Sequence, residues 1–150
     1  MYPGPYAKKF ADRPAFIMAS SGEAVTYGEL EARSNRLAHL LRAQGLQRQG
    51  HYAVFMENNS RYVEACTAGE RSGLYYTCIN GYLQADELAY ILNNSESTLL
   101  ITSADKLAVA EQQVQRYEAA RYKGVSVERL QAVAGALKLR VREVITFEPL

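Results

Sequence analysis

Apolar and polar positions follow two different periods along the first hundred residues. Short runs rich in apolar side chains have the length of β-strands and lie at 15–18, 24–26, 52–56, 74–79 and 98–102. Apolar stripes with helical spacing separate the later runs and predict helices at Glu29–Ala43, Arg61–Ser72 and Ala85–Leu92. The alternation predicts an α/β fold with a partial, mostly parallel sheet and flanking helices.

Residues with known capping and turn preferences separate these elements. Thr26, followed three residues later by Glu29, predicts a capping box at the start of the first helix. Ser60 is expected to cap the second helix, and Gly45 and Gly73 are expected to end the first and second helices. The polar cluster at 20–23 predicts that the first two strands form a hairpin.

Composition excludes several classes of protein. The net charge of +1 gives no basic field to attract nucleic acid, and 48% hydrophobic residues is an ordinary globular value. Cys66 and Cys78 lack a CxxC partner, so we expect two buried thiols in a reducing compartment. His39 and His51 are expected to be structural or solvent-facing, and no metal site is predicted. No apolar run spans a membrane and no signal peptide is visible, so a cytoplasmic location is expected.

Three segments together resemble the motifs of one enzyme family. The segments are Val25–Leu30, Ala68–Asn80, and Asp86–Ser97 continued by Leu99–Ser103. Over about residues 10–103 the chain resembles the AMP-forming acyl-CoA synthetases, the fatty acid–CoA ligases of the adenylate-forming superfamily. The resemblance implies activation of a carboxylate by ATP to an acyl-adenylate, followed by thioester formation with CoA. It therefore implies ATP, Mg²⁺ and CoA as cofactors and a long-chain fatty acid as substrate.

The chain also departs from that family's pattern. Many relatives have proline two residues after the asparagine that stands here as Asn80, whereas this chain has Tyr82. The Ser/Thr-Gly-Thr-Thr-Gly-x-Pro-Lys loop that handles phosphates in the family is absent. We therefore expect residues 1–103 to be a truncated N-terminal ligase segment that is inactive alone, with no catalytic, cofactor or metal residues of its own. A missing ligase half is the expected partner, and an uncovered apolar sheet face predicts self-association.

Two groups of loop residues have alternative roles. Three asparagines follow predicted strands, namely Asn58, Asn59 and Asn80. They could line a substrate cleft, because loops after parallel strands do so, but turn formation is the favoured role. Tyr75, Tyr76 and Tyr82 are expected to belong to the core and to interface surface rather than to a ligand site.

The last part of the chain, 104–150, has a different pattern and is predicted to be a separate all-α tail. Residues 104–145 resemble a partial lambda-repressor-like (Xre/Cro-type) helix-turn-helix, with a short turn expected at 108–110. The candidate DNA contacts are Gln112, Gln113, Gln115, Arg116, Arg121 and Lys123. Because the first helix of that fold is missing, only weak DNA binding is expected. A transcriptional regulator is the alternative function, and a relic without selected activity is a third interpretation.

Overall fold

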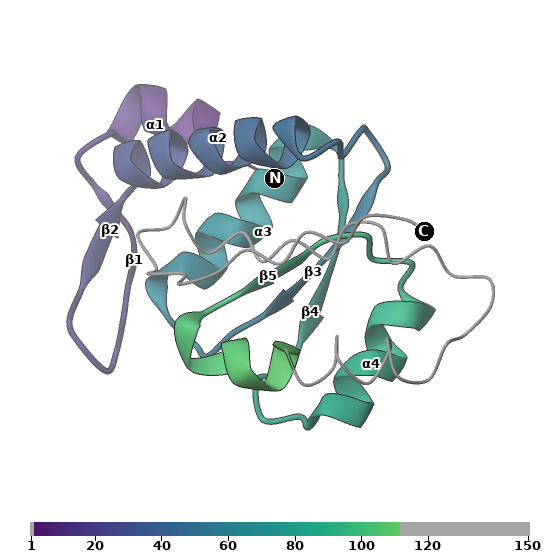
Figure 1. Ribbon diagram of the computed structural model, residues 1–150. Helices are drawn as coiled ribbons and strands as arrows, with labels where there is room; N and C mark the ends of the chain where they lie inside the picture. Colours follow the sequence, from purple (N-terminus) through teal and green to yellow (C-terminus); the bar gives the residue numbers. More distant parts are fainter. Residues whose placement is uncertain (1, 112–150) are drawn as a thin grey trace. The chain divides into compact units, whose positions relative to one another are not determined.

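The computed structural model describes residues 2–111, and the elements of this part are shown in Figure 1. The chain divides into two units, each built from two stretches of sequence. Unit 1 contains residues 2–49 and 58–75 of the described part, and unit 2 contains residues 50–57 and 76–111. We describe each unit separately.

Unit 1 holds three helices and a hairpin. The helices are α1 (Gly4–Phe10), α2 (Tyr27–Ala43) and α3 (Ser60–Ser72), and the hairpin joins β1 (Pro14–Ile17) to β2 (Ala24–Thr26). The antiparallel pairing of β1 with β2 confirms the predicted hairpin. Helix α1 had no counterpart in the sequence prediction, because seven residues are too short for a helical stripe to show. Its Tyr6 ring stacks on Tyr27 at the start of α2, with 5.7 Å between the ring centroids.

Helix α2 has the predicted N-cap, Thr26, and ends at the predicted Ala43, but it begins at Tyr27, two residues before the predicted Glu29. The backbone N–H of Glu29 donates to the Thr26 hydroxyl, and the backbone N–H of Thr26 donates to the Glu29 carboxylate, at 3.2 and 2.9 Å. This is the predicted capping box. Gly45 follows the C-cap with a φ of +92°, a left-handed conformation that glycine adopts at little cost.

The N-cap of helix α3 lies one residue earlier than predicted. Asn59, not Ser60, is the N-cap, and its side chain accepts a 2.9 Å hydrogen bond from the backbone N–H of Arg61. Both residue types cap well, so the sequence could not discriminate between neighbours. Gly73 ends the helix as predicted, with a φ of +66°.

One arginine joins α3 to α2 through a nearly buried polar network. Arg71 donates to both carboxylate oxygens of Glu31, at 2.7 and 3.1 Å, and to the hydroxyl of Ser34 at 2.9 Å. Ser34 is fully buried. The forked contact fixes the angle at which the guanidinium meets α2, so it orients the two helices within unit 1.

Unit 2 is built on a three-stranded sheet. Its strands are β3 (His51–Phe55), β4 (Tyr75–Ile79, whose first residue belongs to unit 1) and β5 (Leu100–Thr102), in the order β4-β3-β5. Strands β3 and β5 run parallel, with Ala53 paired to Leu100 and Phe55 to Thr102. The predicted α/β fold with a parallel sheet and flanking helices is therefore confirmed for the described residues.

The core of unit 2 lies between the sheet and two helical segments. Helix α4 (Ala85–Asn94) contributes Leu88 and Leu92, and the segment after β5 contributes Ala110. These side chains pack with residues of all three strands: Ala53, Phe55, Ile79 and Leu100. The segment 104–111 therefore packs against the same core as the strands before it.

Several predictions about unit 2 need correction. Helix α4 extends two residues beyond the predicted end at Leu92. After a 3₁₀ turn at Ala104–Lys106, residues 107–111 are helical, so the short turn expected at 108–110 is wrong. Whether residues 104–150 form a separate domain stays a prediction, because 112–150 lie outside the described residues.

The predicted burial of some side chains also needs correction. Cys78 is exposed and Cys66 is half-buried, and neither forms a disulfide. Tyr75 and Tyr82 are 57% and 89% exposed, so neither is a core residue. Cys78 and Tyr75 lie on β4, an edge strand of the described sheet, and Tyr82 lies in the loop after it. Whether the tyrosines belong to an interface stays a prediction.

The capping box of α2 makes stability depend on acid pH. The hydrogen bond from the Thr26 backbone N–H holds the pKa of Glu29 below its ordinary value of 4.5. Desolvation opposes this shift, and the Thr26 hydroxyl and the charge of Arg33 add to it. A lowered folded-state pKa gives stability that is present above pH 4.5 and is lost as the pH falls through the folded value.

We therefore expect Glu29→Gln to reduce the pH dependence of unfolding between pH 3 and pH 5, measured by urea denaturation at each pH. Thr26→Ala should cost about 1 kcal/mol at neutral pH. Glu23→Gln, in the exposed turn of the hairpin, is the control. A Glu29→Gln curve with the wild-type pH dependence would contradict this role.

Candidate functional site at the carboxyl edge of the sheet

Polar residues follow each strand of the sheet in unit 2. Glu57 comes two residues after β3, Asn80 comes directly after β4, and Ser103 comes directly after β5. Because the strands are parallel, these residues gather at one edge of the sheet. In open α/β sheets this carboxyl edge is where ligands bind. It is therefore the candidate functional site of the described residues.

A carboxylate and a hydroxyl join two of these loops. The Ser103 hydroxyl donates a short hydrogen bond to Oε2 of Glu57. Ser103 is buried and Glu57 is half-buried, so the contact lies partly out of water. It holds the end of β3 against the end of β5.

The loop after β4 forms a tight turn beside the end of β3. The Asn80 side-chain oxygen accepts from the backbone N–H of Tyr82 at 3.1 Å, and the Asn80 carbonyl accepts from the N–H of Leu83 at 3.1 Å. A Cβ atom on Gly81 would lie 2.8 Å from the carbonyl oxygen of Met56. Only glycine fits this close approach of two backbones without a shift.

The side chain of Lys106 lies over the Tyr82 ring of this turn. The ammonium of Lys106 is 5.6 Å from the centroid of the Tyr82 ring, a distance typical of a cation–π contact. Since the Tyr82 ring is almost fully exposed, this pair presents a positive charge and an aromatic face to solvent. The edge thus carries a carboxylate, an amide, a hydroxyl and an ammonium.

This set of groups offers hydrogen-bond donors, hydrogen-bond acceptors and a positive charge to a polar ligand. It contains neither histidine nor cysteine, the usual groups for proton transfer or nucleophilic attack near neutral pH. Within residues 2–111 there is no cluster of three or more acidic, histidine or cysteine side chains able to hold a metal ion.

Across the same range no helix has the length and apolar character needed to cross a membrane.

The structure assigns turn roles to two of the three asparagines. Asn59 caps α3, and Asn80 forms the turn after β4, as the favoured interpretation predicted. Asn58 is exposed. His51 at the start of β3 is structural, because its Nδ1 lies 2.8 Å from the carbonyl oxygen of Ser95, and His39 on α2 is solvent-facing.

The remaining candidate residues were either predicted but lie outside the described part of the chain, or were found only in the structure. The six candidate DNA contacts, Gln112, Gln113, Gln115, Arg116, Arg121 and Lys123, lie outside the described residues. Sequence reasoning missed Glu57, Gly81, Ser103 and Lys106. Their position in the sequence could have identified them, because each lies within four residues of the end of a predicted strand.

Comparison with known protein families now identifies the class of protein. The family model described as AMP-binding enzyme matches residues 5–145. The chain therefore belongs to the AMP-binding, adenylate-forming enzyme family. The match includes residues 104–145, and nothing in the comparisons supports a helix-turn-helix in that segment.

Two of the similar curated proteins are acyl-CoA ligases. The chain is 37% identical over 94 residues to 3-oxocholest-4-en-26-oate–CoA ligase of Rhodococcus rhodochrous, covering 61% of this chain and 17% of that protein. It is 32% identical over 90 residues to the medium/long-chain-fatty-acid–CoA/3-oxocholest-4-en-26-oate–CoA ligase of Mycolicibacterium smegmatis, covering 60% and 16%. The chain thus spans about a sixth of the length of these relatives.

Solved structures show the same fold. A fatty acyl CoA synthetase of Mycobacterium tuberculosis matches 73% of this chain and 22% of its own, with a TM-score of 0.67 and 25% identity. The unliganded O-succinylbenzoate coenzyme A synthetase of Bacillus subtilis matches 97% of this chain and 28% of its own, with a TM-score of 0.72 and 23% identity. A second structure of that synthetase, at 21% identity and a TM-score of 0.69, is a complex with AMP.

The close approach at Gly81 predicts that adding a methyl group at this position lowers the free energy of unfolding. We expect Gly81→Ala to destabilise the chain by about 1–3 kcal/mol, because the new Cβ would meet backbone rather than a movable side chain. Tyr82→Ala is the control, since it removes only an exposed ring and should cost less than about 1 kcal/mol. Equal denaturation midpoints for Gly81→Ala and wild type would contradict the packing described.

Proposed function

We propose that this chain supplies the N-terminal, sheet-bearing part of an acyl-CoA ligase that activates a long-chain fatty acid. The observation that carries the proposal is the match of the AMP-binding family model across residues 5–145. The parallel sheet of unit 2 and the two ligase relatives support it. The name of the Mycolicibacterium relative, which includes medium- and long-chain fatty acids, supports the choice of substrate class.

The reaction proposed for the complete catalytic unit has two steps. A carboxylate oxygen of the fatty acid attacks the α-phosphorus of ATP, and pyrophosphate leaves with the electron pair of the broken P–O bond. The CoA thiolate then attacks the acyl carbon, and AMP leaves as the thioester forms. Both steps need groups that stabilise charge on the phosphates, and the Ser/Thr/Gly phosphate loop is absent from these 150 residues.

The contribution of this chain is therefore positioning. Glu57 and Ser103 hold the ends of β3 and β5 together, and Gly81 brings the loop after β4 against the chain at Met56. A rigid carboxyl edge of this kind supports one wall of a ligand site while other residues carry the phosphate chemistry. ATP, Mg²⁺ and CoA are the cofactors proposed for the complete unit.

The 150-residue chain should show no ligase turnover by itself. We expect ATP–pyrophosphate exchange with palmitate or shorter fatty acids to remain at the level of a heat-treated control, because the phosphate-binding loop is absent. Exchange above that level would contradict the proposed division of roles.

A complementation experiment tests whether this chain can supply the N-terminal part of an active ligase. A ligase relative from which the matching N-terminal segment has been deleted should regain pyrophosphate exchange when this chain is added. The Val54→Asp variant is the control, because it places a charge in a fully buried position of β3 and should not restore activity. Failure of wild-type chain in all such pairings would argue against the ligase role.

The alternative function, sequence-specific DNA binding, is tested separately. Its six candidate residues rest on the helix-turn-helix resemblance alone, whereas the family model includes the same segment. We expect only weak, sequence-independent binding, with a log–log salt slope near −3 if about three phosphates are contacted. Fluorescence anisotropy against a randomised duplex pool measures this. Enrichment of one palindromic site that is lost in Gln113→Ala would favour the regulator.

A further inference from the structure

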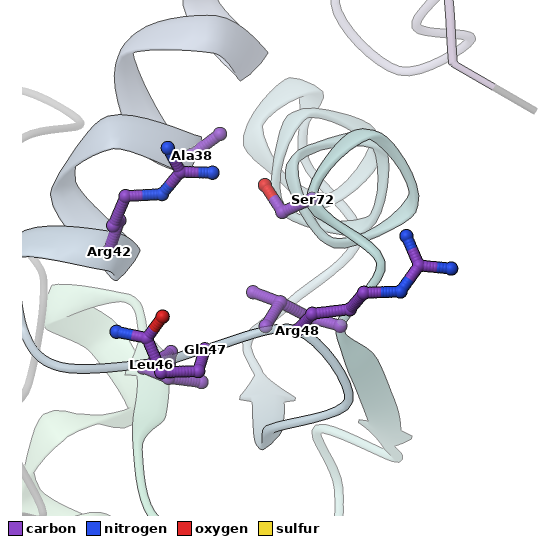
Figure 2. Close-up of a pocket in the computed structure, with 7 residues that line it drawn as sticks. Ala38, Arg42, Leu46, Gln47, Arg48 and Ser72 are labelled. Carbon is purple, nitrogen blue, oxygen red and sulfur yellow. The ribbon is translucent and has the colours of Figure 1, made fainter.

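Unit 1 contains a cavity to which the proposed function assigns no role. Its volume is about 240 Å³, and it opens where α2 and α3 end. The lining residues are Ala38, Arg42, Leu46, Gln47, Arg48, Ser72 and Leu74. Leu46 and Leu74 are buried, so they give the cavity an apolar floor. Apart from Ala38, the other lining residues are polar, and two of them are arginines (Figure 2).

The polar groups of this cavity have no partners among the described residues. Arg42 and Arg48 make no ion pair there, and the side chains of Gln47 and Ser72 make no hydrogen bond there. None of the described residues that line the cavity is acidic. Arg71, the residue before Ser72, provides the contrast, because Glu31 and Ser34 engage its guanidinium fully.

Figure 2 shows how the groups are placed. Arg42 and Gln47 lie on one side of the open space and Ser72 on the other. The stem of Arg48 borders the space, while its guanidinium points away from Arg42 and lies beside Gly73, where a Cβ would be 3.4 Å from Nη1. Arg48 is exposed, so a rotamer change that brings its charge to the cavity takes only picoseconds to nanoseconds.

The ends of the two helices oppose an anion only weakly here. Helix C-termini carry partial negative charge, which arises from carbonyl groups without partners. At α2 the carbonyls of Leu40, Leu41 and Arg42 accept backbone hydrogen bonds from the residues that follow the helix. At α3 the carbonyl of Gly69 accepts from the N–H groups of Gly73 and Leu74. The two full positive charges of the arginines therefore outweigh the partial negative charge that remains at the helix ends.

We infer that this cavity binds a phosphate monoester with a compact apolar substituent. A phosphate monoester carries a charge of about −1.5 to −2 at neutral pH, which two guanidinium groups match. The planar forks of Arg42 and Arg48 suit phosphate oxygens, and the Gln47 amide and the Ser72 hydroxyl are further donors. The apolar floor takes the substituent, and a volume below about 300 Å³ limits its size.

Phenyl phosphate is the probe for this site, titrated into the full 150-residue chain with ¹⁵N labelling. We expect saturable shifts in the Arg42 and Arg48 side-chain signals and in the backbone signals around residues 46–48 and 72–74. Arg42→Ala and Arg48→Ala should each weaken binding about tenfold or more, because each removes a charged hydrogen-bond donor. Arg36→Ala, which removes another exposed arginine of α2 outside the cavity, is the matched control and should bind as wild type.

Three further probes separate the parts of the proposal. Inorganic phosphate should bind more weakly than phenyl phosphate because it leaves the apolar floor uncovered, and benzoate should bind more weakly because it carries one charge. Phenol should not bind. The site is refuted if phenyl phosphate gives no saturable shifts, if phenol binds equally well, or if Arg36→Ala causes the same loss as Arg42→Ala. Unchanged backbone spectra of the free variants ensure that a loss reflects binding and not unfolding.

Discussion

The burial of strand β3 is the constraint on which the rest of unit 2 depends. Tyr52, Ala53, Val54 and Phe55 are all completely inaccessible, so side chains on both faces of this strand are covered. A strand of this kind must lie inside a sheet, because neither of its faces can meet water. It hydrogen-bonds to β4 on one side and to β5 on the other, and its parallel register with β5 determines where the loops after the strands emerge.

The placement of those loops connects the fold to the family. Glu57 and Ser103 are distant in sequence, and they meet only because parallel pairing brings the ends of β3 and β5 to the same edge. The position of the polar residues at the sheet edge thus depends on main-chain pairing, and their side chains interact only after that pairing has brought them together. This order explains how the fold is shared with solved coenzyme A ligases at low sequence identity, since pairing and burial tolerate many apolar substitutions.

The parts of the fold that could be predicted from the sequence are those with a local cause. The capping box at Thr26 and the glycine at Gly73 depend on residues within one or two turns of helix, and both are confirmed. The bond between Glu57 and Ser103 spans 46 residues and leaves no periodic trace. The turn expected at 108–110 failed for a related reason, because the burial of Ala110 against strand residues outweighs a local resemblance to another fold.

The turn at Asn80 also affects how this chain reaches its folded state. A proline at the position of Tyr82 would have no N–H to donate. Here the N–H of Tyr82 closes the turn onto the Asn80 side chain, so a hydrogen bond and not a pyrrolidine ring restrains the loop. A bond preceding proline isomerises over tens of seconds, whereas the bond between Gly81 and Tyr82 is trans in the unfolded chain. The loop after β4 therefore forms without a slow isomerisation at this bond.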